Sequence, residues 1–133
     1  MNYTSLVTKK KQYKYSANIC FDMKNDEKLA GFIPNVTTTE ILKEYLLGII
    51  NRNADVHSRI LYGSYGTGKS HLLTVLSDLL GHVNTDGKGI VEFLKSISKY
   101  DKDLASEINR FVKEEQPYLV VPIYANFGDF DKC

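Results

Sequence analysis

One stretch near the middle of the 133-residue chain constrains its fold more than any other, the sequence Gly-Ser-Tyr-Gly-Thr-Gly-Lys-Ser at residues 63–70. It fits G-x-x-x-x-G-K-[ST], the phosphate-binding P-loop or Walker A motif. The apolar run Ile60-Leu61-Tyr62 precedes it and predicts a buried parallel strand at about 58–62. Apolar residues at helical spacing follow it and stop at Gly81. The order of strand, glycine-rich loop and helix predicts an α/β fold of P-loop NTPase type, a parallel sheet flanked by helices.

The residue types in this loop suit the binding of a polyphosphate. The glycines at 63, 66 and 68 can take positive φ and let the main chain approach a ligand closely. Backbone N–H groups from about residue 65 to 71 would form an anion nest, reinforced by the start of the helix. Lys69 is expected to reach the β- and γ-phosphates as the catalytic residue, and the Ser70 hydroxyl to ligate Mg²⁺. The alternative is a flexible Gly/Ser/Thr turn that contains a lysine by chance.

ATP and Mg²⁺ are therefore the expected cofactors. The residues predicted to bind them are Gly63, Ser64, Tyr65, Gly66, Thr67, Gly68, Lys69, Ser70 and His71.

Composition bounds the class of protein without naming a function. The apolar fraction of 43%, the charged fraction of 25% and the net charge of +1 are ordinary for a globular domain, with no general footprint for a polyanion. The two cysteines lie far apart, and no apolar run reaches the length of about 18 residues that spans a bilayer. A cytoplasmic protein without a membrane segment is expected.

The remaining chain divides into an arm at 1–35 and a larger region at 36–133. In the arm, Lys9-Lys10-Lys11 among tyrosines allows contact with DNA or RNA, and the alternative is a solvated terminal arm. Residues 13–21 alternate in a way that is compatible with a short strand, followed by a polar turn.

Three further helices and a strand are predicted from apolar spacing and turn residues. A helix at about 38–52 would be capped by Thr37, with Glu40 completing a capping box. Helices at about 88–99 and 102–115 would form a hairpin. The β-branched run at about 118–125 predicts the next strand, at an edge or a bulge because of Pro122.

With these elements in view, residues from about 30 to 128 resemble the N-terminal part of a P-loop ATPase of AAA+-like type. The Phe32-Ile33-Pro34 stretch, the Thr37–Thr39 helix start and Leu61 to Leu73 look most like the large ATPases of BREX-type phage-defence systems. The resemblance implies ATP hydrolysis coupled to remodelling of a nucleic-acid or protein partner. It also implies self-association, or association with other subunits, in which a neighbour completes the site.

The sequence departs from that family in the segment that activates the attacking water. Such ATPases carry a Walker B strand that ends in an acidic pair. Here Asp129 and Asp131 do not close an apolar strand, so the chain is expected to be an N-terminal fragment that stops short of Walker B. Alone it is expected to hydrolyse ATP very slowly or not at all, and the alternative function is a nucleotide-gated scaffold without turnover.

Overall fold

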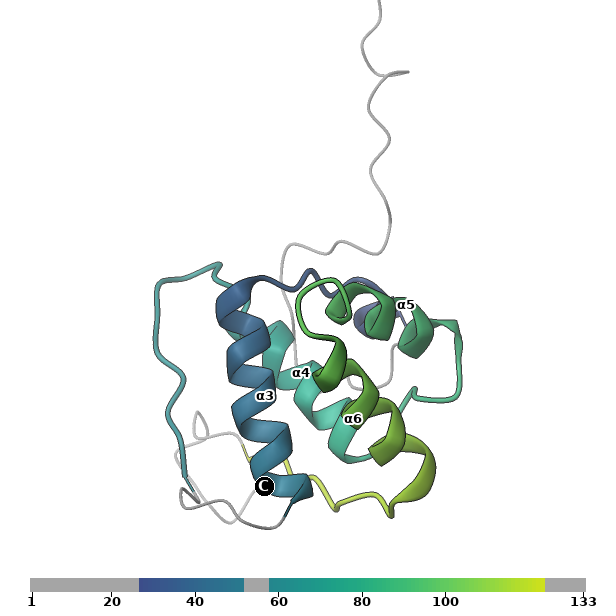
Figure 1. Cartoon of the computed structure of the whole chain (residues 1–133). Coiled ribbons are helices and arrows are strands. Elements are labelled where there is room, and N and C mark those ends of the chain that lie inside the picture. Colours follow the sequence, from purple (N-terminus) through teal and green to yellow (C-terminus); the bar gives the residue numbers. More distant parts are fainter. Residues whose placement is uncertain (1–26, 52–57, 124–133) are drawn as a thin grey trace, which may run out of the picture.

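The computed structural model describes residues 27–51 and 58–123, and the elements in these ranges are helices (Figure 1). They are α2 (Glu27–Ala30), α3 (Val36–Ile50), α4 (Lys69–Leu80), α5 (Lys88–Ile97) and α6 (Lys102–Glu114). Helix α4 packs on α2, α3 and α6, and α5 packs on α2 and α6. The helix that follows the glycine-rich loop is therefore held by three of its neighbours.

The predicted α/β fold is wrong for the part of the chain that the structure describes, where no strand and no sheet is present. Residues 58–62 and 118–123 are not strands, and Ile60 and Leu119 are 89% and 90% exposed. An apolar run becomes a strand only where a neighbouring strand accepts its hydrogen bonds and covers its side chains. Neither segment has such a neighbour within the described ranges. The predicted strand at 13–21 and the end of the one at 118–125 lie outside them.

The helix predicted at about 38–52 is confirmed as α3, but the predicted cap is wrong. Asn35 caps the helix: its Oδ1 accepts a hydrogen bond from the N–H of Thr38 at 2.9 Å. The Thr38 hydroxyl in turn accepts from the N–H of Asn35 at 2.9 Å. This reciprocal pair forms the capping box two residues before the expected one, so Thr37 and Glu40 do not form it.

The predicted helical pair at 88–115 is confirmed as α5 and α6, with Asp101 as the N-cap of α6. The Asp101 carboxylate accepts from the N–H of Leu104 at 2.9 Å and from Nζ of Lys43 at 2.6 Å. These two hydrogen bonds hold the pKa of the Asp101 carboxyl below its usual value. The hydrogen bond between Asp101 and Lys43 also raises the pKa of Lys43. The start of α6 is thus tied to the middle of α3.

The short helix α2 begins within what was predicted as a polar turn.

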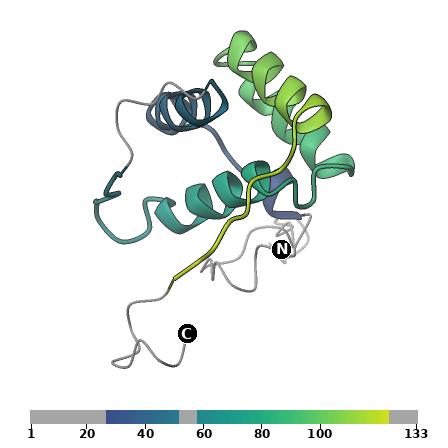
Figure 2. The same ribbon diagram turned by 90° about the horizontal axis from the view of Figure 1, so that it is seen from below.

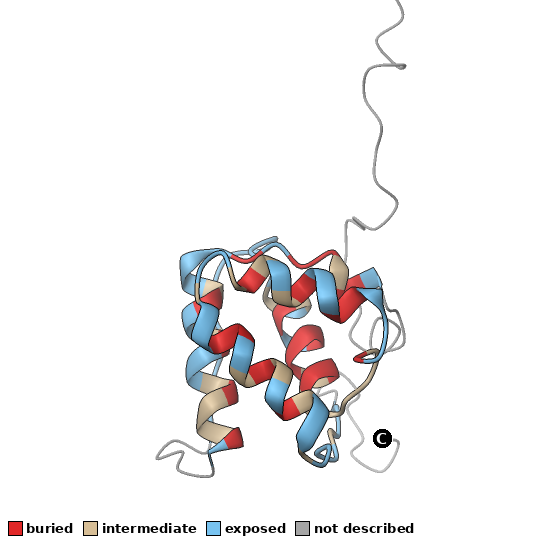
Figure 3. Cartoon of the chain, turned by 45° about the vertical axis from the view of Figure 1, so that its right-hand side comes forward, coloured by how far each residue is buried: buried red, intermediate tan, exposed pale blue. Residues whose placement is uncertain are grey.

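The buried residues lie on the inward faces of the helices (Figure 3). Among the described residues, the two largest fully buried side chains are Phe93 of α5 and Phe111 of α6. The Phe93 ring lies 5.7 Å from the ring of Phe32, in the connection between α2 and α3. Helices α5 and α6 therefore cover the core on the side where they contact α2 and α4.

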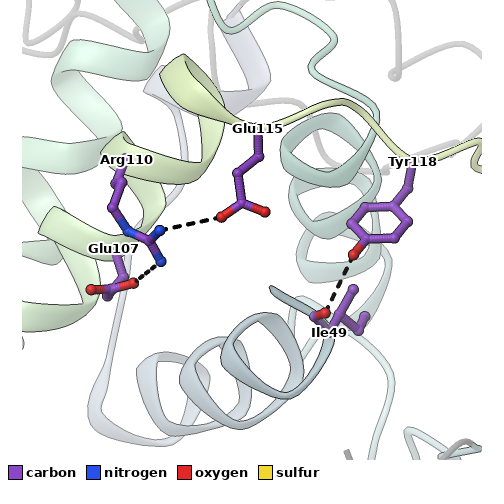
Figure 4. Close-up of polar contacts among 5 residues, drawn as sticks. All are labelled: Ile49, Glu107, Arg110, Glu115 and Tyr118. Atoms are coloured by element: carbon purple, nitrogen blue, oxygen red, sulfur yellow. Dashed lines mark hydrogen bonds and ion pairs between the residues drawn. The ribbon is translucent and has the colours of Figure 1, made fainter. Parts of the chain in front are cut away.

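Tyr118 fastens the segment after α6 to the ends of two other helices (Figure 4). Its hydroxyl donates to the carbonyl of Ile49 at 3.3 Å, and its N–H donates to the carbonyl of Leu80 at 2.8 Å. Carbonyls in the last turn of a helix have no partner within that helix. Tyr118 supplies one for α3 and one for α4, and its ring stacks on Phe111 at 6.1 Å.

The end of α6 is also held by an ion-pair cluster (Figure 4). The Arg110 guanidinium lies 2.7 Å from the carboxylate of Glu107 and 3.3 Å from that of Glu115. These pairs are exposed to solvent, so they orient the chain at the end of α6 more than they stabilise the fold.

His82, just after α4, is half-buried against an aromatic side chain. Its ring meets that of Phe111 edge to face at 4.8 Å, and no described residue hydrogen bonds to its buried Nε2. Burial lowers the pKa of His82, and the negative charges of Asp86 and Glu115 oppose that shift. The folded protein therefore favours the neutral imidazole.

We expect the free energy of unfolding to fall as the pH is lowered through the His82 titration. The unfolded chain takes up this proton near pH 6.5, before the folded chain does, so the stabilisation is complete above about pH 6.5 and is lost below it. Urea unfolding at pH 7.5 and pH 5.0 measures the loss. His82→Leu should lose less stability than the wild type between these two pH values. An equal loss in both proteins would exclude His82 as a source of the pH dependence.

Candidate functional site

The candidate site is the loop of residues 63–68, which lies between the end of α3 and the start of α4 and projects away from the other helices (Figure 2). Helix α4 begins at Lys69, as the sequence predicts, and its N-cap is Gly68. Gly68 has no side chain that could cap this end of the helix, and no other cap is present among the described residues. The first-turn N–H groups of α4 are therefore left for solvent or a ligand, at the positive end of the helix dipole.

Two glycines shape the loop. Gly66 and Gly68 both have φ of +82°, in the left-handed region that residues with a Cβ seldom adopt. A Cβ built on either would meet nothing within 4 Å. Backbone conformation, rather than crowding by neighbours, is thus the reason that glycine is needed at these two positions.

The Lys69 side chain folds back over the loop instead of extending into solvent. Its Nζ donates to the carbonyl oxygens of Gly63 at 2.9 Å and Ser64 at 2.6 Å, and lies 3.2 Å from Oγ1 of Thr67. The Thr67 hydroxyl also donates to the carbonyl of Ser64, at 2.9 Å. The ammonium group is therefore held at the mouth of the loop by neutral acceptors, which an anion can replace.

The structure brings together four of the predicted ligand-binding residues, namely Gly63, Ser64, Thr67 and Lys69, around this ammonium group. Tyr65 does not join them, because its side chain is 96% exposed. Ser70 lies in the first turn of α4 and is exposed, so its hydroxyl is accessible to a metal ion. Within the described ranges, no group of three or more His, Cys, Asp or Glu residues could hold a metal ion.

His71 has a structural role that its place in the motif does not indicate. Its Nε2–H donates to the carbonyl of Lys28 at 2.8 Å, and its ring lies edge to face on Phe32 at 5.5 Å. The side chain thus fastens the start of α4 to α2, while its N–H remains in the first turn of the helix. A contact across 43 residues of chain has no local sequence signal.

Arg59, four residues before the loop, makes a second pair of contacts that the sequence does not indicate. Its guanidinium forms an ion pair with Glu44 and lies over the ring of Tyr45, 5.0 Å from the centroid. Both partners are on α3. The loop is therefore fastened on its entry side to α3 and on its exit side to α2.

Comparison with protein-family models, with curated proteins and with solved structures found no match to this chain. Among the described residues, none of the helices is both long enough and apolar enough to cross a bilayer. The glycine-rich loop and its geometry are therefore the features of the chain that bear on its function.

Proposed function

We propose that residues 63–71 bind the phosphate tail of ATP together with Mg²⁺. The observation that supports this most directly is the position of the Lys69 ammonium group, 2.9 Å and 2.6 Å from the carbonyls of Gly63 and Ser64 at the uncapped start of α4. One fixed cation, a loop with two left-handed glycines and the free N–H groups of a helix start are complementary to a polyphosphate.

Each part of the loop has a separate task in this proposal. Lys69 exchanges two neutral carbonyl acceptors for phosphate oxygens, and the charge-assisted hydrogen bonds it then makes are the stronger ones. The first-turn N–H groups of α4, that of His71 among them, donate to the same ligand. The exposed Ser70 hydroxyl would supply one oxygen ligand to Mg²⁺, a cation that prefers oxygen ligands.

On the resemblance of the loop, we place this site in a larger cytoplasmic ATPase that remodels a nucleic-acid or protein partner, of the kind that acts in phage defence. Self-association or binding to other subunits is part of that proposal. The alternative is a nucleotide-gated scaffold that binds ATP without hydrolysing it. A phosphate-release assay tests the ATPase against the scaffold: release above background that is lost in Lys69→Ala supports hydrolysis, even where it is as slow as expected for this chain alone.

Lys69→Ala should weaken ATP binding at least about ten-fold, because it removes a charge-assisted contact worth more than about 1.4 kcal/mol. Isothermal titration calorimetry with Mg²⁺-ATP measures the change. The free-energy cost to folding should be small, since the Lys69 contacts are exposed.

Lys88→Ala is the matched control for this experiment. Lys88 is also the first residue of a helix, and it too follows a glycine N-cap without a side-chain cap, but no glycine-rich loop precedes it. Its replacement should leave ATP binding unchanged. Failure of the wild type to bind, or equal losses in the two variants, would overturn the proposal.

A further inference from the structure

The segment that leads into the glycine-rich loop, residues 58–62, has few contacts with the helices. Ile60 is 89% exposed and Tyr62 is 92% exposed. Leu61 is partly buried against the core, and the Arg59 side chain is only 27% exposed. Among the described residues, the contacts that hold this segment therefore come from Leu61 and Arg59.

Arg59 makes two contacts that reinforce one another. Its guanidinium pairs with the carboxylate of Glu44 and lies 5.0 Å from the centroid of the Tyr45 ring. A planar guanidinium can hydrogen bond at its edge and stack on an aromatic ring with its face at the same time. Because both partners are consecutive residues of α3, the direction of the Arg59 side chain is fixed as well as its position.

Helix α3 is a rigid support for this contact. Leu42 and Leu46, in the same two turns as Glu44 and Tyr45, are fully buried in the core. The adjacent Lys43 is tied to the N-cap of α6 through Asp101. Movement of Arg59 relative to the core would therefore require the ion pair and the ring contact to break.

We infer that Arg59 is a positioning residue, which holds the entry side of the loop so that Gly63 and Ser64 meet the ammonium group of Lys69. Those two carbonyls lie four and five residues after Arg59, whereas Lys69 belongs to α4, which the His71 side chain ties to α2. Without Arg59, the two sides of the loop are no longer held at a constant separation. Its effect on affinity rests on the proposed function, while its effect on the loop does not.

Arg59→Gln tests this inference, because glutamine keeps much of the length of the side chain and removes its charge. Backbone ¹⁵N order parameters of residues 60–66 should fall from about 0.85 towards about 0.6. The Kd for Mg²⁺-ATP should rise about five-fold, in line with the loss of one exposed ion pair and one cation–π contact. Arg59→Lys keeps the charge without the planar guanidinium. Its order parameters and its Kd should lie between those of the wild type and those of Arg59→Gln.

Arg110→Gln is the matched control, since it breaks two ion pairs on α6 without touching the loop. It should change neither the order parameters nor the Kd. The double variant Glu44→Arg/Arg59→Glu restores an ion pair in the opposite sense and should recover part of the order lost in Arg59→Gln.

Two results decide the question. Order parameters that stay unchanged in Arg59→Gln would overturn the positioning role, whatever happens to ATP binding. If the order parameters fall in Arg59→Gln but the wild type does not bind ATP, the positioning role is supported and the proposed ligand is overturned.

Discussion

Replacing Phe93 with alanine should lower the free energy of unfolding by about 3–5 kcal/mol. The Phe93 side chain is fully buried, and its ring lies 5.7 Å from that of Phe32. Truncation removes the contact through which α5 covers the connection between α2 and α3, and it leaves a cavity that the surrounding helices can fill only in part. Urea unfolding followed by circular dichroism measures the loss, provided that the slope of the transition is unchanged.

Val91→Ala provides the control on the same helix. The Val91 side chain is 64% exposed, so its truncation should change the free energy of unfolding by no more than about 0.5 kcal/mol. Similar losses in the two variants would contradict the observed packing of α5, because the helix would then have no buried face.

The helices could be predicted from the sequence because their signals are local. Apolar spacing located α3 to α6, and Gly81 marks the end of α4 as expected. The cap of α3 is misplaced because Thr37 with Glu40 matches the usual capping box, whereas the observed box uses Thr38 in place of Glu or Gln. Asn35 and Thr38 satisfy each other's N–H groups, and asparagine is a better N-cap than threonine. This signal is also local, but it departs from the usual residue pattern.

The strands could not be predicted reliably, because pairing is not a local property. Residues 58–62 and 118–123 have the β-branched and aromatic composition of strands, yet Tyr62 and Ile123 are exposed at 92% and 72%. A strand needs a partner at hydrogen-bonding distance, and that partner is set by the whole chain. Tyr118 instead uses its N–H and hydroxyl to cap α4 and α3.

The main-chain features of the candidate site could be predicted from the sequence. The long-range side-chain contacts that hold the loop in place could not. The motif located the glycines, the start of α4 and Lys69, because each follows from spacing along one short stretch. The supports are His71 on the carbonyl of Lys28 and Arg59 on Tyr45, which join residues 43 and 14 positions apart. Such pairs become visible only when the helices have been placed.

Replacing Gly68 with alanine should weaken ATP binding at least about ten-fold and lower the free energy of unfolding by about 1–2 kcal/mol. Gly68 has φ of +82°, and a Cβ there would meet no neighbour, so the cost comes from the backbone conformation itself. Alanine relieves that cost by rotating out of the left-handed region. The carbonyl of Gly68 accepts the first hydrogen bond of α4, from the N–H of Leu72 at 2.9 Å, so this rotation moves the helix start.

The loss of affinity follows because Lys69 is the next residue. When the start of α4 moves, the ammonium group leaves its place beside the carbonyls of Gly63 and Ser64, and the first-turn N–H groups change direction with it. Calorimetry with Mg²⁺-ATP and urea unfolding measure the two effects on the same protein.

Gly87→Ala separates this effect from the general cost of placing alanine at a helix N-cap. Gly87 is the N-cap of α5 and also lacks a side-chain cap, but its φ of −101° is open to any residue. The weaker capping by alanine and the smaller entropy of its unfolded chain oppose each other, so stability should change by less than about 0.5 kcal/mol. ATP binding should not change. If Gly68→Ala and Gly87→Ala show the same changes in ATP affinity and in the free energy of unfolding, the left-handed conformation of Gly68 is not required for anion binding by the loop.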